Sequence, residues 1–143
     1  MAVNTITGSA IVLSIDLSGS TSPTAVAGAT TGSLSVNQET IDVTNKDSSG
    51  RKEFINGVKS WTLDCEAFTT SSGETVSGDT SIAALEAGTK IYVQFRDGSG
   101  QASAKKYTGY GYITSIGVNA NVGEFSTYSV SIAGTGALTA ASA

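Results

Sequence analysis

The chain has 143 residues, a net charge of −4 and only 14% charged residues, which predicts one domain, residues 1–143, with a surface of small neutral polar groups. It contains no His and only eight Lys and Arg residues, so a basic stripe for tight nucleic-acid binding and a histidine general base are both excluded. Cys65 is the only cysteine, which excludes an intramolecular disulfide. A surface with so few charges favours a protein that makes contacts with copies of itself.

The ends of the chain carry no targeting signal that we recognise. Residues 1–10 lack a basic segment followed by an apolar one, and no apolar run approaches the roughly 20 residues needed to span a bilayer. We therefore expect synthesis in the cytoplasm and no membrane partner. We expect residues 1–10 and 139–143 to be flexible or to become ordered only at an interface.

Apolar residues mostly recur at every second position between clusters of Gly, Ser and Asn, which is typical of strands. In chain order we expect strands at 11–17, 32–44, 58–68, 90–96, 106–118 and 125–134, with loops at 19–28 and 98–104. One short helix is expected at 80–87, because Asp79 and Thr80 are capping residues and Gly88 is a natural helix stop. The predicted fold is therefore all-β with one short helix.

The strand predicted at 32–44 changes the parity of its apolar residues, from Leu34 and Val36 to Ile41 and Val43. We expect a bulge or bend at 37–39 to accommodate this change. The following segment, 45–57, concentrates five charges in thirteen residues: Lys46, Asp47, Arg51, Lys52 and Glu53. It is either a solvated connector or a docking arm.

Three of the predicted strands have one apolar face and one polar face. The apolar faces carry Trp61, Leu63, Cys65 and Ala67; Tyr128, Val130 and Ile132; and Ile41 and Val43. We expect these faces to be buried, with Trp61 as the anchor of the core between sheets. The opposite faces carry short polar or acidic side chains: Thr40, Asp42, Thr62, Asp64, Glu66, Ser129 and Ser131. A wet face is ordinary for an antiparallel sheet, but the absence of Lys and Arg also suits a pore through which DNA slides.

We expect no catalytic, cofactor-binding or metal-binding residues and no enzymatic activity. Cys65 lies on the apolar face of its strand, as a core thiol does. Asp64 and Glu66 share a strand face, but no aromatic platform or cleft-forming insertion accompanies them. Asp42, Asp64 and Glu66 are not part of an Asp-rich calcium loop, and Gly98-Ser99-Gly100 reads as a turn.

The segments 32–36, 41–50 and 54–63, the small helix and the ending 129–136 together resemble the major tail tube proteins of long-tailed bacteriophages and gene transfer agents. The resemblance covers about residues 12–138. Arg51 stands where many relatives carry an aromatic residue, so we expect different contacts at the tip of this loop.

The resemblance implies an antiparallel β-sandwich or barrel flanked by a helix, with six copies in a ring and stacked rings forming a continuous inner β-barrel. In such a tube the polar residues Thr40, Asp42, Thr62, Asp64, Glu66, Ser129 and Ser131 are expected to line the lumen. The loop residues Lys46, Asp47, Arg51, Lys52 and Glu53 are expected to dock on the adjacent ring.

The partners implied are other copies of the chain, tail tip and tail terminator proteins, and a tape measure protein and DNA that pass through the lumen without tight binding. No cofactor is implied, and the location is the virion tail, assembled in the host cytoplasm. Two alternatives stay open. One is the inner tube of a contractile injection system, and the other is a non-catalytic β-sandwich binding or adhesion module that uses Tyr107, Tyr110 and Tyr112.

Overall fold

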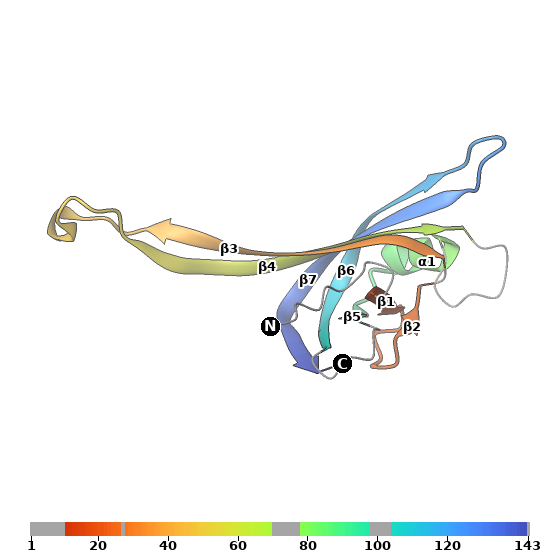
Figure 1. Ribbon diagram of the computed structural model, residues 1–143, viewed down its shortest axis with the longest axis horizontal. Helices are drawn as coiled ribbons and strands as arrows, with labels where there is room; N and C mark the ends of the chain where they lie inside the picture. The colour runs from red at the N-terminus through yellow and green to blue at the C-terminus, as the bar shows by residue number, and fades with distance from the viewer. Residues whose placement is uncertain (1–10, 27, 70–77, 98–103, 143) are drawn as a thin grey trace, which may run out of the picture.

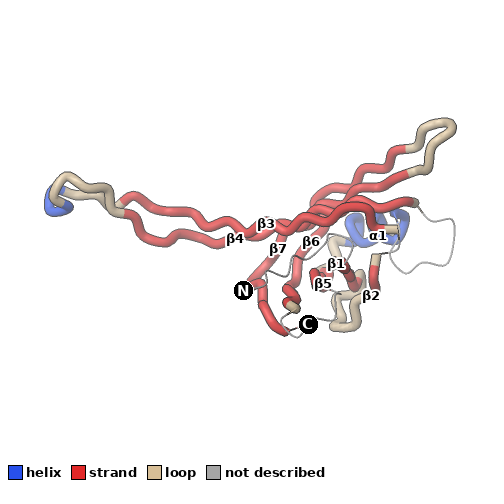
Figure 2. Tube along the Cα trace, in the orientation of Figure 1, coloured by secondary structure: helices blue, strands red, loops and turns tan. Residues whose placement is uncertain are grey.

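The computed structural model describes residues 11–26, 28–69, 78–97 and 104–142. Its strands are β1 (Ile11–Asp16), β2 (Thr24–Ala25), β3 (Ala29–Asp42), β4 (Phe54–Phe68), β5 (Ile91–Asp97), β6 (Lys105–Asn119) and β7 (Thr127–Ser142). The helix α1 (Gly78–Ala87) lies between β4 and β5, and a turn of 3₁₀ helix (Lys46–Ser48) connects β3 to β4. The strands form one antiparallel sheet in the order β2-β1-β5-β6-β7-β4-β3, which confirms the predicted fold class (Figures 1 and 2).

The sheet folds over a core because β6 and β7 are shared between two layers. The first part of β6, Lys106 to Gly111, pairs with β5, whereas Tyr112 to Asn119 pairs only with β7 among the described strands. Figure 1 shows β1, β2 and β5 lying beneath β3 and β4, with α1 beside them. The core between these layers is built from buried residues of β1, β4, α1, β5, β6 and β7: Leu13, Ile15, Leu63, Cys65, Ala67, Ala84, Ile91, Val93, Ile113, Val130 and Ile132.

The helix α1 ends as its sequence predicts. Gly88 has φ +64, its N–H donates to the carbonyl of Leu85, and the N–H of Thr89 donates to the carbonyl of Ala84. These two bonds are a Schellman motif, which satisfies the last carbonyls of the helix. The buried positions Ser81 and Ala84, one turn apart, face the core.

The hairpin of β3 and β4 extends well beyond the body of the molecule, and we call residues 37–60 the arm (Figure 1). The expectation that Ile41 and Val43 are buried is wrong, since they are 51% and 38% exposed. The physical reason is that alternation along β3 places Ile41 and Val43 on the side of Ser33 and Ser35, away from the core. The other layer of the sheet and α1 also do not extend to this part of the hairpin (Figure 1).

The irregularity expected at 37–39 is present, but the additional residue belongs to β4. Gln38 pairs with Lys59 and Thr40 pairs with Asn56, so β3 advances by two residues while β4 advances by three. A β-bulge on β4 therefore produces the register shift.

Several element boundaries differ from the sequence prediction. The loop expected at 19–28 contains the short strand β2, and residues 54–57 belong to β4 rather than to a loop. The last strand continues to Ser142 instead of ending at residue 134, so residues 139–142 are ordered within the subunit. The termini 1–10 and 143, and most of the loop predicted at 98–104, lie outside the described residues.

Candidate functional site

The base of the arm is fixed by Trp61, which is 4% exposed. Its indole lies against Gly109 of β6 and Gly134 of β7, where a Cβ at Gly134 would overlap the ring. The indole N–H donates to the carbonyl oxygen of Gly136 at 3.3 Å, and Gly136 adopts φ +75, a conformation that favours glycine. These glycines let a large ring enter the core between two paired strands.

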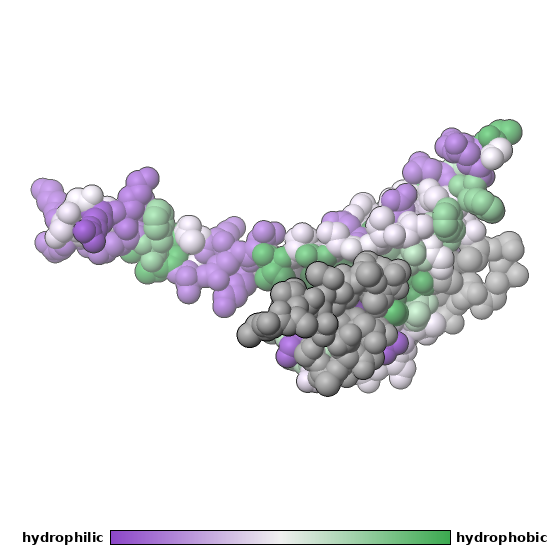
Figure 3. Space-filling model, in the orientation of Figure 1, coloured by the Kyte–Doolittle hydropathy of each residue, from purple (hydrophilic) through white to green (hydrophobic). Residues whose placement is uncertain are grey.

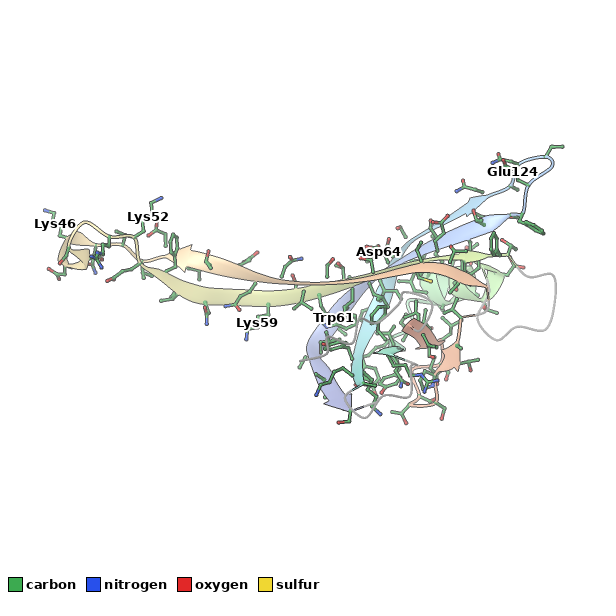
Figure 4. The ribbon with its side chains drawn as sticks, in the orientation of Figure 1. Lys46, Lys52, Lys59, Trp61, Asp64 and Glu124 are labelled. Carbon is green, nitrogen blue, oxygen red and sulfur yellow. The ribbon has the colours of Figure 1, made fainter. Side chains whose placement is uncertain are left out.

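One face of the sheet formed by β3, β4, β7 and β6 is polar and uncovered. The register of β4 and β7 brings Asp64 opposite Ser131 and Glu66 opposite Ser129. The hydroxyl of Ser131 donates to a carboxylate oxygen of Asp64 at 2.6 Å. Figure 4 shows Asp64 and Trp61 on opposite sides of β4, as strand alternation requires. We call this surface the polar face.

Five of the seven residues predicted to share a polar surface lie on the polar face: Thr62, Asp64, Glu66, Ser129 and Ser131. Thr40 and Asp42 do not join them. They lie in the arm, opposite Asn56 and Phe54, and alternation along β3 puts them on the side that carries Leu34 and Val36. The carboxylate of Asp42 accepts a hydrogen bond from the N–H of Thr44 at 2.9 Å, and hydrogen bonds from Thr44 lower its pKa.

The polar face also contains residues that the sequence prediction did not include. Ser33 and Thr31 of β3 pair with Asp64 and Glu66, and Ser115 of β6 pairs with Ser131. The alternation of Ser33 and Ser35 with Leu34 and Val36 was a usable signal for β3. The sequence carried no such signal for Ser115, because a register shift between Ile113 and Ser115 changes the parity of β6.

The polar face is acidic and carries no cation. The strand segments that form it, 31–37 of β3, 60–66 of β4, 127–131 of β7 and 115–119 of β6, contain Asp64 and Glu66 but no Lys or Arg. The apolar side beneath it is sealed, with Leu63, Cys65, Val130 and Ile132 all buried. This surface is therefore a smooth, negatively charged wall of short side chains.

Both edges of this four-stranded portion are open within the described part of the chain. β3 is the last strand of the sheet, with only β4 as a neighbour. On the other side, Tyr112 to Asn119 of β6 pairs with β7 alone. Unpaired backbone N–H and C=O groups along two long edges are a template for pairing with another chain.

The tip of the arm is a defined turn with free charges. Asn45 accepts a hydrogen bond from the N–H of Asp47 at 2.8 Å and exchanges hydrogen bonds with Ser48, which forms a capping box. The predicted loop residues Lys46, Asp47, Arg51, Lys52 and Glu53 are all exposed. None of these five side chains forms an ion pair with another described residue. The turn thus holds charges that are available to a partner.

The described residues offer little chemistry for catalysis or metal binding. The thiol of Cys65 is buried, and desolvation raises its pKa to about 11, so it stays protonated at neutral pH. Among the described residues, no three His, Cys, Asp or Glu side chains gather where they could hold a metal ion. No described helix has the length and apolar character needed to cross a membrane.

A family model described as phage tail tube protein matches residues 5–140. The chain belongs to this family. The resemblance stated from the sequence is therefore confirmed, and the role of this tail tube protein is structural, in the tail of a virion. A comparison with curated proteins gives no match.

Solved structures share the fold of this tail tube protein at low sequence identity. A chain from the virion of a native gene transfer agent particle has a TM-score of 0.78 and 21% identity, covering 96% of this chain and 100% of that chain. A chain from the tail of an empty gene transfer agent particle, refined with C6 symmetry, has a TM-score of 0.75 and 24% identity over 94% and 98%.

The SPP1 tail tube has a TM-score of 0.76 and 12% identity over 97% of this chain and 80% of that chain. Chains from contractile injection systems also share the fold.

Proposed function

We propose that six copies of this tail tube protein close into a ring in which the β3 edge of one copy pairs with the β6 edge of the next. The observation that carries this proposal is the pair of open edges on one four-stranded sheet. β3 and β6 are three antiparallel steps apart and so run in opposite directions. When a second copy is placed beside the first by rotation about the ring axis, the β3 edge of one copy therefore meets the β6 edge of the other as an antiparallel pair. The number six rests on the C6 symmetry of the related gene transfer agent tail.

In this ring the polar face becomes the wall of the bore. Two carboxylates from every copy, Asp64 and Glu66, give the channel a single sign of charge, which low-dielectric walls focus. Each phosphate gripped by a Lys or Arg would add salt-dependent binding, and the polar face offers neither. The lining thus suits passage of DNA and of a tape measure protein without tight binding. Thr62, Ser129 and Ser131 complete the lining, whereas Thr40 and Asp42 of the arm are left out of it.

Stacked rings make the tube, and the tip of the arm docks on the adjacent ring. Its unpaired charges, Lys46, Asp47, Arg51, Lys52 and Glu53, can form ion pairs at the rim of that contact, where charges set register more than affinity. Tail tip and tail terminator proteins then bind the two ends of the tube. Assembly takes place in the host cytoplasm.

The same subunit design also suits the inner tube of a contractile injection system. The specific support for this second candidate is the shared fold with the sheath-tube complex of an extracellular contractile system. A sheath protein encoded beside this chain, and its co-sedimentation with the purified tube, would favour this second candidate.

Disulfide cross-linking tests the ring. We would place one cysteine on β3, at Ser33 or Ser35, and one on β6, at Ser115 or Gly117, in the full chain. Within one copy these positions are three strand spacings of roughly 4.8 Å apart, beyond the Cα separation of about 7 Å that a disulfide tolerates. The buried native Cys65 does not interfere.

For at least one of these four pairs, we expect oxidation to give a series of covalent oligomers on a denaturing gel, a ladder that ends at the hexamer. The matched control pairs Ser115→Cys with Thr24→Cys on β2, the other terminal strand of the sheet. A ladder from the control pair and none from the β3 pairs would overturn the proposed edge pairing.

A further inference from the structure

The hairpin of β6 and β7 ends beside the last residue of β4 in an exposed apolar surface, which we call the apolar tip: Phe68, Val122 and Phe125. Val122 is fully exposed, and Phe125 is 85% exposed. The ring of Phe125 packs edge-on against Phe68 with centroids 5.8 Å apart, so the two aromatic side chains form one surface. Figure 3 shows this hydrophobic surface at the end of the hairpin that projects from the body.

The turn that carries the apolar tip is held by hydrogen bonds on both sides. The N–H of Glu124 donates to the carbonyl of Asn121, and the side-chain amide of Asn121 donates to the Glu124 carboxylate at 3.2 Å. The hydroxyl of Ser126 donates to the carbonyl of Asn119 at 2.9 Å, and the N–H of Thr69 donates to the carbonyl of Ser126. Val122 and Phe125 are thus displayed by an organised turn, and exposed apolar patches of this kind mark interaction sites.

A second exposed apolar surface lies on the arm, which we call the apolar arm surface: Ile41, Ile55 and Val58. Ile41 pairs with Ile55 across the hairpin, and Val58 is 72% exposed. Lys52 precedes the β4 residues of this surface, and Lys59 follows them but pairs with Gln38 on the opposite face of the hairpin. Figure 4 shows these lysines along the arm, at the end of the molecule opposite Glu124.

The two surfaces are at opposite ends of one strand, because β4 begins at Phe54 in the arm and ends at Phe68 in the apolar tip. Neither surface can therefore cover the other within one copy. Two different surfaces on one chain that fit each other produce a head-to-tail contact, which repeats without closing unless a rotation closes it. That is the geometry that adds one ring to the next.

We propose that the apolar tip of each subunit packs against the apolar arm surface of a second copy in the neighbouring ring. Burial of both surfaces supplies the affinity, and Glu124, the only charged side chain of residues 119–126, pairs with Lys52 of that copy. This inference rests on the stacking of rings given under the proposed function. It identifies the two surfaces that meet between neighbouring rings, which the charges at the tip of the arm do not identify.

A mixing experiment tests the contact. The tip variant carries Val122→Asp and Phe125→Asp, the arm variant carries Ile55→Asp and Val58→Asp, and a control carries Thr24→Asp and Ala25→Asp on exposed β2. We expect each of the first two to form rings that do not stack, and the control to form normal tubes. Rings of the tip variant keep an intact arm and rings of the arm variant keep an intact tip, so mixing preformed rings should give pairs of rings and nothing longer.

The outcomes are read by light scattering and negative-stain microscopy. Normal tubes from the tip variant, or a mixture that stays as single rings, would overturn the head-to-tail contact. Absence of rings from the unmodified chain would instead overturn the proposed function. A different partner of the apolar tip is indicated if the tip variant forms tubes that fail only in complete particles.

A second measurement avoids disruptive substitutions. A chain with Val122→Cys and a chain with Val58→Cys are mixed and treated with a short bifunctional maleimide, which leaves the buried Cys65 unreacted. We expect heterodimer cross-links in tubes at least ten times more abundant than from Val122→Cys with Thr24→Cys. Tubes that form without this excess would exclude the contact while leaving the ring proposal intact.

Discussion

At the scale of single residues, Gly134 controls how the arm joins the body. A Cβ at this position would overlap the indole of Trp61. We therefore expect Gly134→Ala to lower the free energy of unfolding by about 1–3 kcal/mol through overpacking. Urea denaturation would measure this loss.

The control for Gly134 is Gly32→Ala, whose Cβ would meet the Phe95 ring at an ordinary 3.4 Å. Combining Gly134→Ala with Trp61→Leu should cost less than the sum of the two single changes, because the clash disappears with the indole. Equal costs for Gly32→Ala and Gly134→Ala would contradict the packing described for Trp61.

Asp16 gives the chain an acid-sensitive residue at the end of β1. Hydrogen bonds from the Ser18 and Ser20 hydroxyls lower the pKa of Asp16 from 3.8 to about 2. A lowered folded-state pKa means that Asp16 stabilises the fold above pH 3.8 and that this stabilisation is lost as the pH falls toward about 2.

We expect the difference in unfolding free energy between the wild type and Asp16→Asn to shrink across that pH range. Above pH 3.8, the difference in unfolding free energy between Ser18→Ala and Asp16→Asn should be smaller than the difference between the wild type and Asp16→Asn. A difference that stays constant from pH 6 to pH 2 would show that ionised Asp16 does not stabilise the turn.

At the scale of the elements, the tip of the arm is built so that it can be removed without touching the core. The N–H of Val43 donates to the carbonyl of Glu53, which closes the hairpin below the turn. Deleting residues 48–51 should therefore leave the monomer folded, with an unchanged circular dichroism spectrum, but stop tube growth in microscopy.

A companion variant with Lys46, Arg51 and Lys52 changed to Gln keeps the turn and removes only its positive charges. We expect this variant to form tubes whose rate of growth no longer depends on salt. Tubes of normal length from the deletion would refute a docking role for the tip.

Strand alternation predicted those elements that pack on the core. Trp61, Leu63, Cys65 and Ala67 are buried, and the residues between them are exposed. The same reasoning failed for Ile41 and Val43, because the bulge lies on β4 and β3 keeps its alternation, which leaves these two residues on the side away from the core. The predicted last strand also ended too early, at residue 134, because Gly134 and Gly136 interrupt the alternation where β7 passes between layers.

At the scale of the whole molecule, the charge of the polar face should govern the passage of DNA. Replacing Asp64 and Glu66 with Lys gives the bore wall cations that hold phosphates, so genome ejection should slow, most strongly at low salt where screening is weakest. Ejection kinetics of assembled particles at two ionic strengths would measure this effect.

The control for this charge reversal is Asp79→Lys with Glu86→Lys on the exposed side of α1, away from the polar face. Both variants should assemble, and only the bore variant should eject slowly. Equal ejection rates for both variants at low salt would contradict a lumen position for Asp64 and Glu66.

The polar face itself could be predicted only in part, because its membership depends on pairing between strands distant in the sequence. Thr62, Asp64, Glu66, Ser129 and Ser131 follow from alternation within two strands. Ser115 joins them only through the register shift in β6, and Thr40 and Asp42 leave the face because the bulge lies on β4 rather than β3. Bulges are placed by tertiary packing, which a single sequence does not display.

Trp61 is the only tryptophan in the chain, and it lies where the arm meets the body. Intrinsic fluorescence excited at the indole band therefore reports from one known point rather than from an average over the molecule. Its emission should stay blue-shifted while β4, β6 and β7 remain in contact and move to the red when they separate. A stopped-flow refolding trace would then time the joining of the arm to the body without any label, and the same signal would show whether subunits enter a growing tube already folded.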